Sequence, residues 1–311
     1  MTESAKKRIK FIINPISGTR DKEYIESYII KHIKHTDFFF DIDYTEYAQH
    51  ATIISKEATE KSYDAVIAIG GDGSINEIAS SLTQTNTALG IIPNGSGNGL
   101  AHYLNIPLNV QRAIKIINDY KIIDVDTATI NNKLFVSVAG LGFDALVAEG
   151  FAHSKTRGFF SYLKVIIQNY FSYKRGTYTL YYNGKKIEKK VMMITLANSN
   201  QFGYNSIIAP DAVINDGLLD VCLIEKVPFM EAPLLSLLLF LRRIDESRRI
   251  EIFKTKELTI IQNSKKRVVH IDGDPQIFSK KLHIKVHPKT LKLIVPEKTY
   301  DKLCHYDSAT N

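Results

Sequence analysis

The sequence predicts an α/β protein in which a parallel α/β domain is followed by a domain rich in β-strands. Up to about residue 123, short apolar stretches alternate with segments of helical periodicity, which is typical of a parallel sheet with right-handed crossovers. After that point, short strands and tight turns follow one another, which favours a sandwich or a barrel. We therefore expect domains at residues 1–123 and 124–295, with a tail, 296–311, that could return to the first domain.

Composition limits the class of protein. The chain has 311 residues, of which 44% are hydrophobic, so it can build two cores. Two cysteines cannot form a disulfide framework and no signal peptide is evident, which predicts a cytoplasmic protein. The longest apolar stretch, residues 233–241, is too short to span a bilayer. A net charge of +7 favours an anionic partner such as a nucleotide or an acidic lipid, and no nucleic-acid-binding motif is present.

The first domain is expected to contain four strands, each followed by a helix. Three of the strands are short apolar stretches at residues 8–15, 65–69 and 89–93, and the other is a stretch at residues 38–44 in which apolar and more polar residues alternate. Apolar side chains recur at helical spacing in residues 24–33, 51–58, from 74 onwards and in 100–104. Open α/β sheets bind ligands at the carboxyl ends of their strands, so we expect the four loops after these strands to converge on one site.

The turn after the third strand reads Gly-Gly-Asp-Gly-Ser, residues 70–74. Glycine lets a ligand approach the main chain, and the following helix presents free amides, so we interpret the turn as phosphate-binding. Ser74 and Glu77 have the spacing of a capping box, which predicts a helix beginning at Ser74. A phosphate would repel Asp72 unless a cation lay between them, which indicates a metal-binding or catalytic role. The alternative is an ordinary tight turn.

Residues 94–99 form a second glycine loop, in which Ser96 and Asn98 offer a hydroxyl and an amide as donors. Neither glycine loop is a Walker sequence with its lysine. A Gly-x-Gly-x-x-Ala string at residues 140–145 fits a loose dinucleotide pattern. We reject that interpretation, because the strand before the string is expected to belong to a hairpin and not to a βαβ unit.

The second domain is expected to consist of hairpins and further strands. Residues 127–130 and 134–139 flank one turn, and residues 177–182 and 191–197 flank Asn183-Gly184, a strong hairpin signal. Further strands are expected at residues 218–224, 256–261, 267–271, 282–286 and 291–295. Two apolar helical stretches, 158–173 and 229–249, interrupt them. The second contains arginines near its end and could rest on an anionic membrane, and a buried helix is the alternative.

Acidic side chains stand out in two turns of the second domain, at Asp216 with Asp220 and at Asp272 with Asp274. Side chains two residues apart in an extended chain share a face, so Asp272 and Asp274 could address one site. Asp-Gly turns between strands are also common as purely structural features.

Read together, six strings resemble the diacylglycerol kinase and sphingosine kinase superfamily, in particular its bacterial diacylglycerol kinase-like members. They occur in the order and at roughly the spacing of that family, over nearly the whole chain. The strings are Asn14-Pro-x-Ser-Gly18, Gly70-Gly-Asp-Gly-Ser74 with Asn76 and Glu77, Pro93-x-Gly-Ser-Gly-Asn98, Gly142-Phe-Asp144, Asp216-Gly-Leu-Leu-Asp220 and Asp272-Gly-Asp274.

The resemblance implies an ATP- and Mg²⁺-dependent lipid kinase, cytoplasmic and peripherally associated with membranes. Its fold would be an N-terminal Rossmann-like parallel α/β nucleotide-binding domain, as in NAD kinases, and a C-terminal β-sandwich domain, with the active site in the cleft between them. The substrate would be the hydroxyl of a lipid alcohol such as diacylglycerol or a sphingoid base. The oligomeric state stays open, a homodimer included.

The resemblance also assigns roles to residues. Asp72 would sit by the phosphates and Mg²⁺, and Asp274 would accept the substrate proton with Asp272 beside it. A structural Mg²⁺ would be held by the carbonyls of Val213 and Leu218 and the carboxylate of Asp216. The residues that match ATP-binding positions are Asn14, Pro15, Ser17, Gly18, Thr45, Gly70, Gly71, Asp72, Gly73, Ser74, Glu77, Ser96 and Asn98.

Two departures from the family pattern leave alternatives open. The proton acceptor is usually Glu and is Asp274 here, and the second glycine loop often reads Gly-Thr-Gly-Asn-Asp where this chain has Gly95-Ser-Gly-Asn-Gly99. A base must come within hydrogen-bond reach of the hydroxyl, so the shorter Asp274 requires a closer approach. The alternatives are a kinase of a soluble metabolite such as NAD, and a nucleotide-binding protein without catalysis, which the shorter Asp274 favours.

Overall fold

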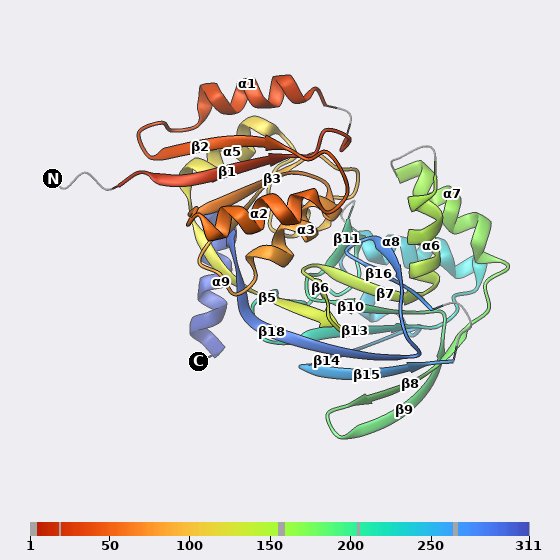
Figure 1. Cartoon of the computed structure of the whole chain (residues 1–311). Coiled ribbons are helices and arrows are strands. Elements are labelled where there is room, and N and C mark those ends of the chain that lie inside the picture. Colours follow the sequence, from red (N-terminus) through yellow and green to blue (C-terminus); the bar gives the residue numbers. More distant parts are fainter. Residues whose placement is uncertain (1–4, 19, 155–158, 204–205, 264–266, 311) are drawn as a thin grey trace. The chain divides into compact units, whose positions relative to one another are not determined.

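The computed structural model describes residues 5–18, 20–154, 159–203, 206–263 and 267–310. The chain divides into two compact units, one formed by residues 1–125 with 289–311 and the other by residues 126–288 (Figure 1). The division lies close to the boundary expected at residue 123. Residues 289–295, which we expected in the second domain, group with the first unit, as does the tail.

A parallel sheet with strand order β2-β1-β3-β4 forms the centre of the first unit. Its strands are β1 (Lys7–Ile13), β2 (Phe38–Tyr44), β3 (Ala65–Gly70) and β4 (Ala88–Pro93), close to the predicted stretches. Every residue of β3 and β4 is buried, as expected for strands covered on both faces. Beyond β4, Leu293 of β18 (Lys281–Ile294) lies opposite Leu89.

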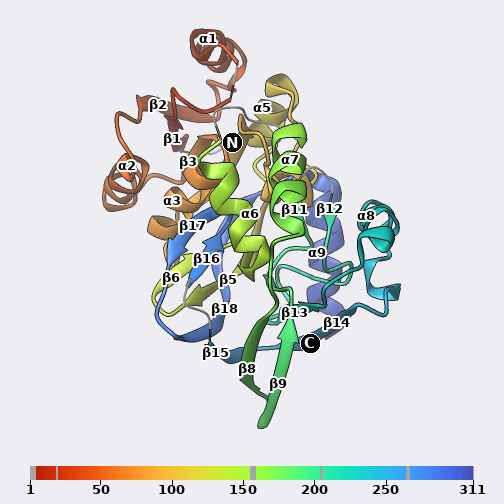
Figure 2. The same cartoon turned by 90° about the vertical axis from the view of Figure 1, so that its right-hand side faces the viewer.

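Helices cover both faces of this sheet. Helix α1 (Lys22–His32) contacts α5 (Val110–Asp119), while α2 (His50–Glu60) contacts α3 (Asp72–Leu82) on the opposite face (Figure 2). The C-terminal helix α9 (Glu297–Thr310) belongs to the same unit, and the Thr299 hydroxyl donates to the Leu104 carbonyl at 2.6 Å, directly after α4 (Gly99–Tyr103). Helices α5 and α9 were not predicted.

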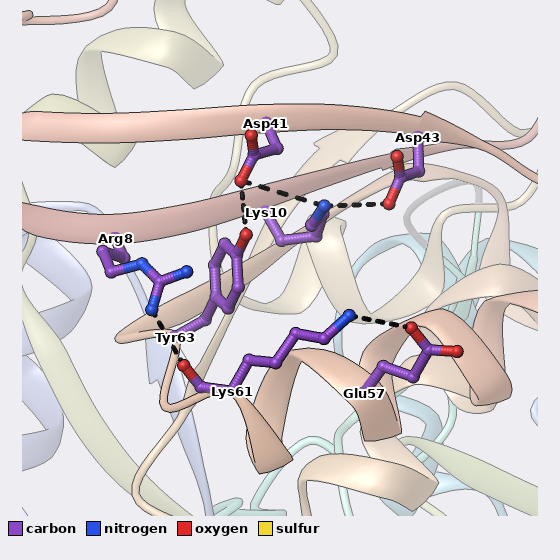
Figure 3. A network of polar contacts seen from close by, with 7 residues as sticks. All are labelled: Arg8, Lys10, Asp41, Asp43, Glu57, Lys61 and Tyr63. Carbon is purple, nitrogen blue, oxygen red and sulfur yellow. Dashed lines mark hydrogen bonds and ion pairs between the residues drawn. The ribbon is translucent and has the colours of Figure 1, made fainter.

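Polar contacts fasten the edge strand β2 to β1 (Figure 3). Lys10 Nζ of β1 lies 2.9 Å from Asp43 Oδ2 and 3.9 Å from Asp41 Oδ2 of β2. The Tyr63 hydroxyl, just before β3, donates to the same Asp41 carboxylate. Burial lowers the pKa of Lys10, but its hydrogen bond with Asp43 and the nearby acidic groups outweigh that effect and raise the pKa. The charged Lys10 therefore helps to fix the register of β2 against β1.

The second unit is a sandwich of antiparallel strands, and the expectation of a C-terminal β-sandwich is confirmed. Leu180, Ile260 and Ile284 of one sheet pack with Ile194 and Val221 of the other in a single core. One sheet contains β5 (Ile122–Ile130), β6 (Lys133–Phe135), β8 (Gly176–Tyr182), β9 (Lys185–Val191), β15 (Glu257–Gln262) and part of β18. The other has the order β14 (Ile250–Thr255), β13 (Leu219–Ile224), β10 (Met193–Ala197), β7 (Val138–Gly142), β16 (Val268–Ile271) and β17 (Asp274–Ile277).

Several predicted strands of this unit have different bounds. The turn at Asn183-Gly184 is confirmed, with Tyr182 opposite Lys185, but its second arm is β9 and not residues 191–197, which contain β10. Strand β9 has four lysines among its seven residues, so it lacks the apolar pattern from which a strand is predicted. Lysines of this kind are common on edge strands, and β9 is one. The stretch 134–139 is divided between the end of β6 and the start of β7, with residues 136–137 between them, and residues 282–286 and 291–294 belong to one continuous strand, β18.

The helical stretches are also shorter than predicted. Residues 229–249 form a 3₁₀ turn (Phe229–Glu231), α8 (Ala232–Phe240) and a second 3₁₀ turn (Ile244–Glu246), because Arg242 adopts a left-handed conformation with φ 61° after α8. The other stretch contains α7 (Phe159–Tyr170), and residue 158 lies outside the described residues. The Gly-x-Gly-x-x-Ala string joins β7 to α6 (Phe143–Ala152), and β7 pairs antiparallel with β10 and β16, so no parallel βαβ unit is present there.

Candidate active site

Two loops of the first unit meet at Asn14, which follows β1. Its side-chain amide donates to the Ser74 hydroxyl at 2.9 Å, and its Oδ1 accepts the N–H of Ile16 at 3.1 Å. Its backbone N–H donates to Ile69 of β3 at 3.0 Å. Asn14 therefore joins the first loop to the glycine turn, as expected for residues at the carboxyl ends of adjacent strands.

The predicted capping box is wrong. Helix α3 begins at Asp72 and is preceded by Gly71 in an extended conformation, so Ser74 lies inside the first turn and is not the N-cap residue. The Ser74 hydroxyl instead receives the hydrogen bond from Asn14. Because the helix begins earlier than predicted, Asp72 and Gly73 are part of its N-terminal turn, where backbone N–H groups have no partner within the helix.

Asp72 fastens the two glycine loops to each other. Its Oδ2 accepts the N–H of Asn98 and its Oδ1 accepts the N–H of Gly99, both at 2.9 Å. Asn98 has a left-handed backbone with φ 52° and closes its own loop, donating to the Gly95 carbonyl at 2.7 Å and accepting the Gly95 N–H at 3.0 Å. The carboxylate that we expected beside Mg²⁺ is therefore also the link that shapes the loops.

The glycines of these loops have different surroundings. A Cβ on Gly95 would lie 2.5 Å from the Cα of Gly71, and a Cβ on Gly18, whose φ is +58°, would lie 2.1 Å from the carbonyl oxygen of Asn94. Real side chains do not tolerate such distances, so these glycines let the loops touch. A Cβ on Gly73, by contrast, would meet nothing within 4 Å. Gly73 is thus the position where open space adjoins the start of α3.

The remaining predicted nucleotide residues lie in the loops that follow β1, β2 and β4 and on α3. The buried Asn94 donates its side-chain amide to the Ser17 carbonyl at 3.1 Å, which holds the first loop against the second. Thr45 is buried after β2, and its N–H donates to Ile13 at the end of β1. Glu77 is half-buried on α3, about one turn beyond Gly73. Pro15, Gly18 and Ser96 are exposed. Asn94 was not among the predicted site residues, although it stands at the carboxyl end of β4.

In the second unit, Asp272 and Gly273 form a two-residue hairpin turn between β16 and β17. Their φ angles are 46° and 87°, and Ile271 pairs with Asp274. This is the geometry of a turn with two left-handed residues, for which Asp-Gly is favoured. The expectation that Asp272 and Asp274 share one face of an extended strand is therefore wrong.

The two carboxylates of this turn have different environments. The Asp272 carboxylate is buried and accepts three backbone N–H groups, from Val136, Ser137 and Val138, at 2.9, 2.9 and 3.0 Å. Asp274 is exposed, and its Oδ2 accepts a hydrogen bond from the Gln276 side chain at 3.2 Å. Asp272 anchors the turn, whereas the Asp274 carboxylate is exposed at its surface.

A buried histidine and a buried carboxylate lie side by side beneath the same turn. His270 Nε2 is 2.9 Å from Asp144 Oδ2, and the Thr195 hydroxyl donates to that oxygen at 3.3 Å. A Cβ on Gly140 would lie 2.1 Å from the Asp144 carboxylate, so only glycine leaves room for the pair. Burial lowers the pKa of His270, but Asp144 outweighs that effect and raises it. His270 was not predicted, because its partner is distant in the sequence.

Two of the three groups expected to hold a structural Mg²⁺, the Val213 carbonyl and the Asp216 carboxylate, already have partners. The N–H of Asp216 donates to the Val213 carbonyl at 3.3 Å, and Asp216 Oδ1 accepts the N–H of Leu218 at 2.9 Å. Asp216 Oδ2 lies 2.8 Å from the ammonium of Lys254, a residue that the sequence did not single out. Within the described ranges, no three His, Cys, Asp or Glu side chains are grouped as metal ligands. A divalent ion on Asp216 would adjoin a positive charge, so the residues present do not fit it.

Comparison with known proteins gives the family. Residues 8–130 match the family described as "Diacylglycerol kinase catalytic domain", and residues 137–295 match the "YegS C-terminal NAD kinase beta sandwich-like domain". The chain is 27% identical over 230 residues to a diacylglycerol kinase of Bacillus subtilis, covering 72% of this chain and 76% of that one. It is 23% identical over 307 residues to a diacylglycerol kinase of Staphylococcus carnosus, covering 92% and 97%.

Solved structures show the same fold. A diacylglycerol kinase from Bacillus anthracis str. Sterne superposes with a TM-score of 0.73 at 18% identity, covering 95% of this chain and 99% of that one. An NAD kinase from Archaeoglobus fulgidus in complex with ATP has a TM-score of 0.53 at 13% identity, covering 98% and 100%. The two family matches together extend over most of the sequence, in the order that the six strings indicated. The chain therefore belongs to the diacylglycerol kinase family of lipid kinases.

Proposed function

We propose that this enzyme uses Mg²⁺ and ATP to phosphorylate the hydroxyl of a lipid alcohol, such as diacylglycerol or a sphingoid base. The observation that carries the proposal is the link made by Asp72, which holds both glycine loops together beside the open amide end of α3. Backbone amides and a helix N-terminus bind phosphate groups without a lysine. Asn14, Ser74 and Asn98 support this arrangement by fixing the loops.

The chemistry that we assign to the chain is positioning and one proton transfer. The lipid hydroxyl oxygen forms a bond to the γ-phosphorus of ATP, the bond from that phosphorus to the bridging oxygen breaks, and ADP leaves. Asp274 accepts the hydroxyl proton, since it is an exposed carboxylate on a turn that Asp272 holds in place. Magnesium bound with the triphosphate would offset its negative charge, which is the main electrostatic need of phosphoryl transfer.

We also propose that the enzyme reaches its lipid at an anionic membrane surface. Leu235, Leu238 and Leu239 of α8 pack on the sandwich, while Leu234 and Leu237 on the other side are 59% and 52% exposed. Phe240 and Leu241 at the end of the same helix are exposed as well, and contiguous apolar patches on a surface mark contacts with a membrane or a protein. Within the described part of the chain, no helix is long and apolar enough to cross a membrane.

A second group of exposed residues, in which basic side chains lie near aromatic rings, supports the same proposal. Two shallow hollows of the second unit are lined by Lys174, Arg175, Lys190 and Lys226 together with Tyr170, Phe171 and Phe229. Phe171 and Phe229 are both exposed, and their ring centroids are 5.1 Å apart. Lysine and arginine attract anionic headgroups, and aromatic rings favour the boundary between headgroups and acyl chains.

The direct test is transfer of labelled γ-phosphate from ATP. The purified enzyme is given diacylglycerol, a sphingoid base or NAD, the lipids in mixed micelles and the NAD in buffer. We expect label in a lipid phosphate, only when Mg²⁺ is present, and none in NAD. Transfer to NAD alone would favour a soluble metabolite kinase, and ATP binding without transfer to any acceptor would favour a non-catalytic nucleotide-binding protein.

A further inference from the structure

The ammonium group of Lys254 lies at the centre of an acidic cluster in the second unit. Its Nζ is 2.8 Å from Asp216 Oδ2, 3.0 Å from Asp220 Oδ2 and 3.0 Å from the backbone carbonyl of Asp211. The two carboxylates are almost completely buried, with side chains 5% and 3% exposed. A buried carboxylate needs a compensating positive charge, and here one lysine serves two of them.

Backbone pairing fixes this lysine in place. Lys254 of β14 is directly opposite Asp220 of β13 in the antiparallel register, so both residues emerge from neighbouring strands of one sheet. The loop that carries Asp216 is held in place by another contact, in which the Gly217 N–H donates to Asp126 Oδ2 at 2.6 Å. Strand pairing therefore positions Lys254 beside Asp220, and the bond to Asp126 fixes the loop that carries Asp216.

A lysine ammonium and a divalent cation require similar surroundings. Both bind carboxylate and carbonyl oxygens, and the ammonium donates hydrogen bonds to the Asp211 carbonyl and to Asp216 while it lies at ion-pair distance from Asp220. The two cations cannot share Asp216, because two positive charges in contact inside a poorly hydrated site repel each other strongly. One of them must occupy the site, and the chain supplies its own.

We propose that the Lys254 ammonium replaces the divalent cation that the family resemblance implies at Val213, Asp216 and Leu218. The second unit then folds without a metal ion, and the enzyme needs Mg²⁺ only with its nucleotide. This inference does not rest on the proposed function, because it concerns charge compensation within one unit and is tested without ATP or lipid.

The experiment measures thermal unfolding of the full chain without nucleotide, in EDTA and then with excess Mg²⁺ or Mn²⁺. For the natural sequence we expect the same Tm in both conditions, within about 1 °C. Lys254→Met should lower Tm in EDTA by about 5 to 10 °C, the usual consequence of leaving a buried charge without its partner. Added metal should restore a measurable part of that loss, and the additional change Asp216→Asn should abolish the recovery.

Lys189→Met is the matched control. Lys189 Nζ lies 2.6 Å from Glu251 Oε2 on the surface of the same unit, with both side chains more than a third exposed. Removing this pair should change Tm by less than about 2 °C and create no response to metal. A Lys254→Met protein as stable as the control, or one that metal does not stabilise, would contradict the proposal.

The unaltered chain decides the question even if Lys254→Met does not fold. Titration with Mn²⁺, followed by the loss of its free electron-resonance signal, should detect no tight stoichiometric binding in the absence of nucleotide. One tightly bound Mn²⁺ per chain that disappears in Asp216→Asn would overturn the inference.

Discussion

The glycine turn of the first unit and the hairpin turn of the second unit both contain an aspartate that looks catalytic, and both aspartates bind backbone amides. Asp72 accepts two N–H groups and Asp272 accepts three. Next to them, Gly73 adjoins open space and Asp274 is exposed. The comparison teaches that, in each turn, an aspartate holds the structure by accepting backbone N–H groups, while a residue one or two positions further on is exposed.

Replacing Asp272 should give the largest loss of stability. Asp272→Ala leaves three buried N–H groups without an acceptor, so we expect the free energy of unfolding to fall by about 3 to 5 kcal/mol. Urea unfolding measures this loss. Asp245→Asn, at an exposed position of the second 3₁₀ turn, is the control and should cost less than about 0.5 kcal/mol. Equal effects of the two changes would show that Asp272 is not an anchor.

The His270–Asp144 pair should make stability depend on pH. Because the pKa of His270 is raised above its ordinary value of 6.5 in the folded protein, the pair contributes fully below about pH 6.5 and loses its contribution as the pH rises through the folded pKa. The charges facing the ring are those of Asp144 and Asp272.

His270→Gln tests this dependence. At pH 6 we expect the substitution to cost about 2 to 4 kcal/mol, because Asp144 is left buried without its charged partner. The difference in unfolding free energy between the natural sequence and the variant should shrink from pH 6 to pH 9. A difference that is constant over this range, or that grows with pH, would mean that the pair is not ionised in the folded state.

Replacing Asp72 should weaken ATP binding about as much as it lowers stability. Asp72→Ala frees the amides of Asn98 and Gly99, and we expect a loss of about 1 to 3 kcal/mol in stability and a 10- to 100-fold weaker Kd for ATP. Asp72→Asn retains one acceptor oxygen, so its stability and its Kd for ATP should lie between those of the natural sequence and those of Asp72→Ala. Calorimetric titration with ATP compares them. Unchanged ATP affinity in Asp72→Ala would show that the loops joined by Asp72 do not form the nucleotide site.

Helix α8 should show the smallest effect on stability, because its exposed leucines contribute little to the core. Leu234→Ser together with Leu237→Ser should change the unfolding free energy by less than about 1 kcal/mol and weaken binding to vesicles of anionic phospholipid at least 5-fold. Leu238→Ala, on the packed face, should lower the unfolding free energy by more than the double variant does and leave binding to vesicles unchanged. Sedimentation with vesicles measures the binding, and full retention of binding in the double variant would exclude α8 as a membrane contact.

The fold could be predicted where the pattern is local. The uninterrupted apolar residues of β3 and β4 and the Asn183-Gly184 turn indicated their structures directly. Strand β9 was missed because its lysines hide the alternation, and the early start of α3 was missed because Gly71 and not Ser74 occupies the N-cap. Lys254 and His270 could not be predicted, since each acquires its role only when a partner distant in the chain is brought beside it.

The most direct test of the central claim is the turnover of Asp274→Asn. If Asp274 accepts the substrate proton, kcat for a lipid acceptor should fall by about 10²- to 10⁴-fold, while the Kd for ATP and the Tm stay the same. Asp245→Asn should keep full activity. An Asp274→Asn enzyme with near-normal kcat would contradict the assignment of the base and, with it, the division of the hairpin turn into a residue that anchors and a residue that reacts.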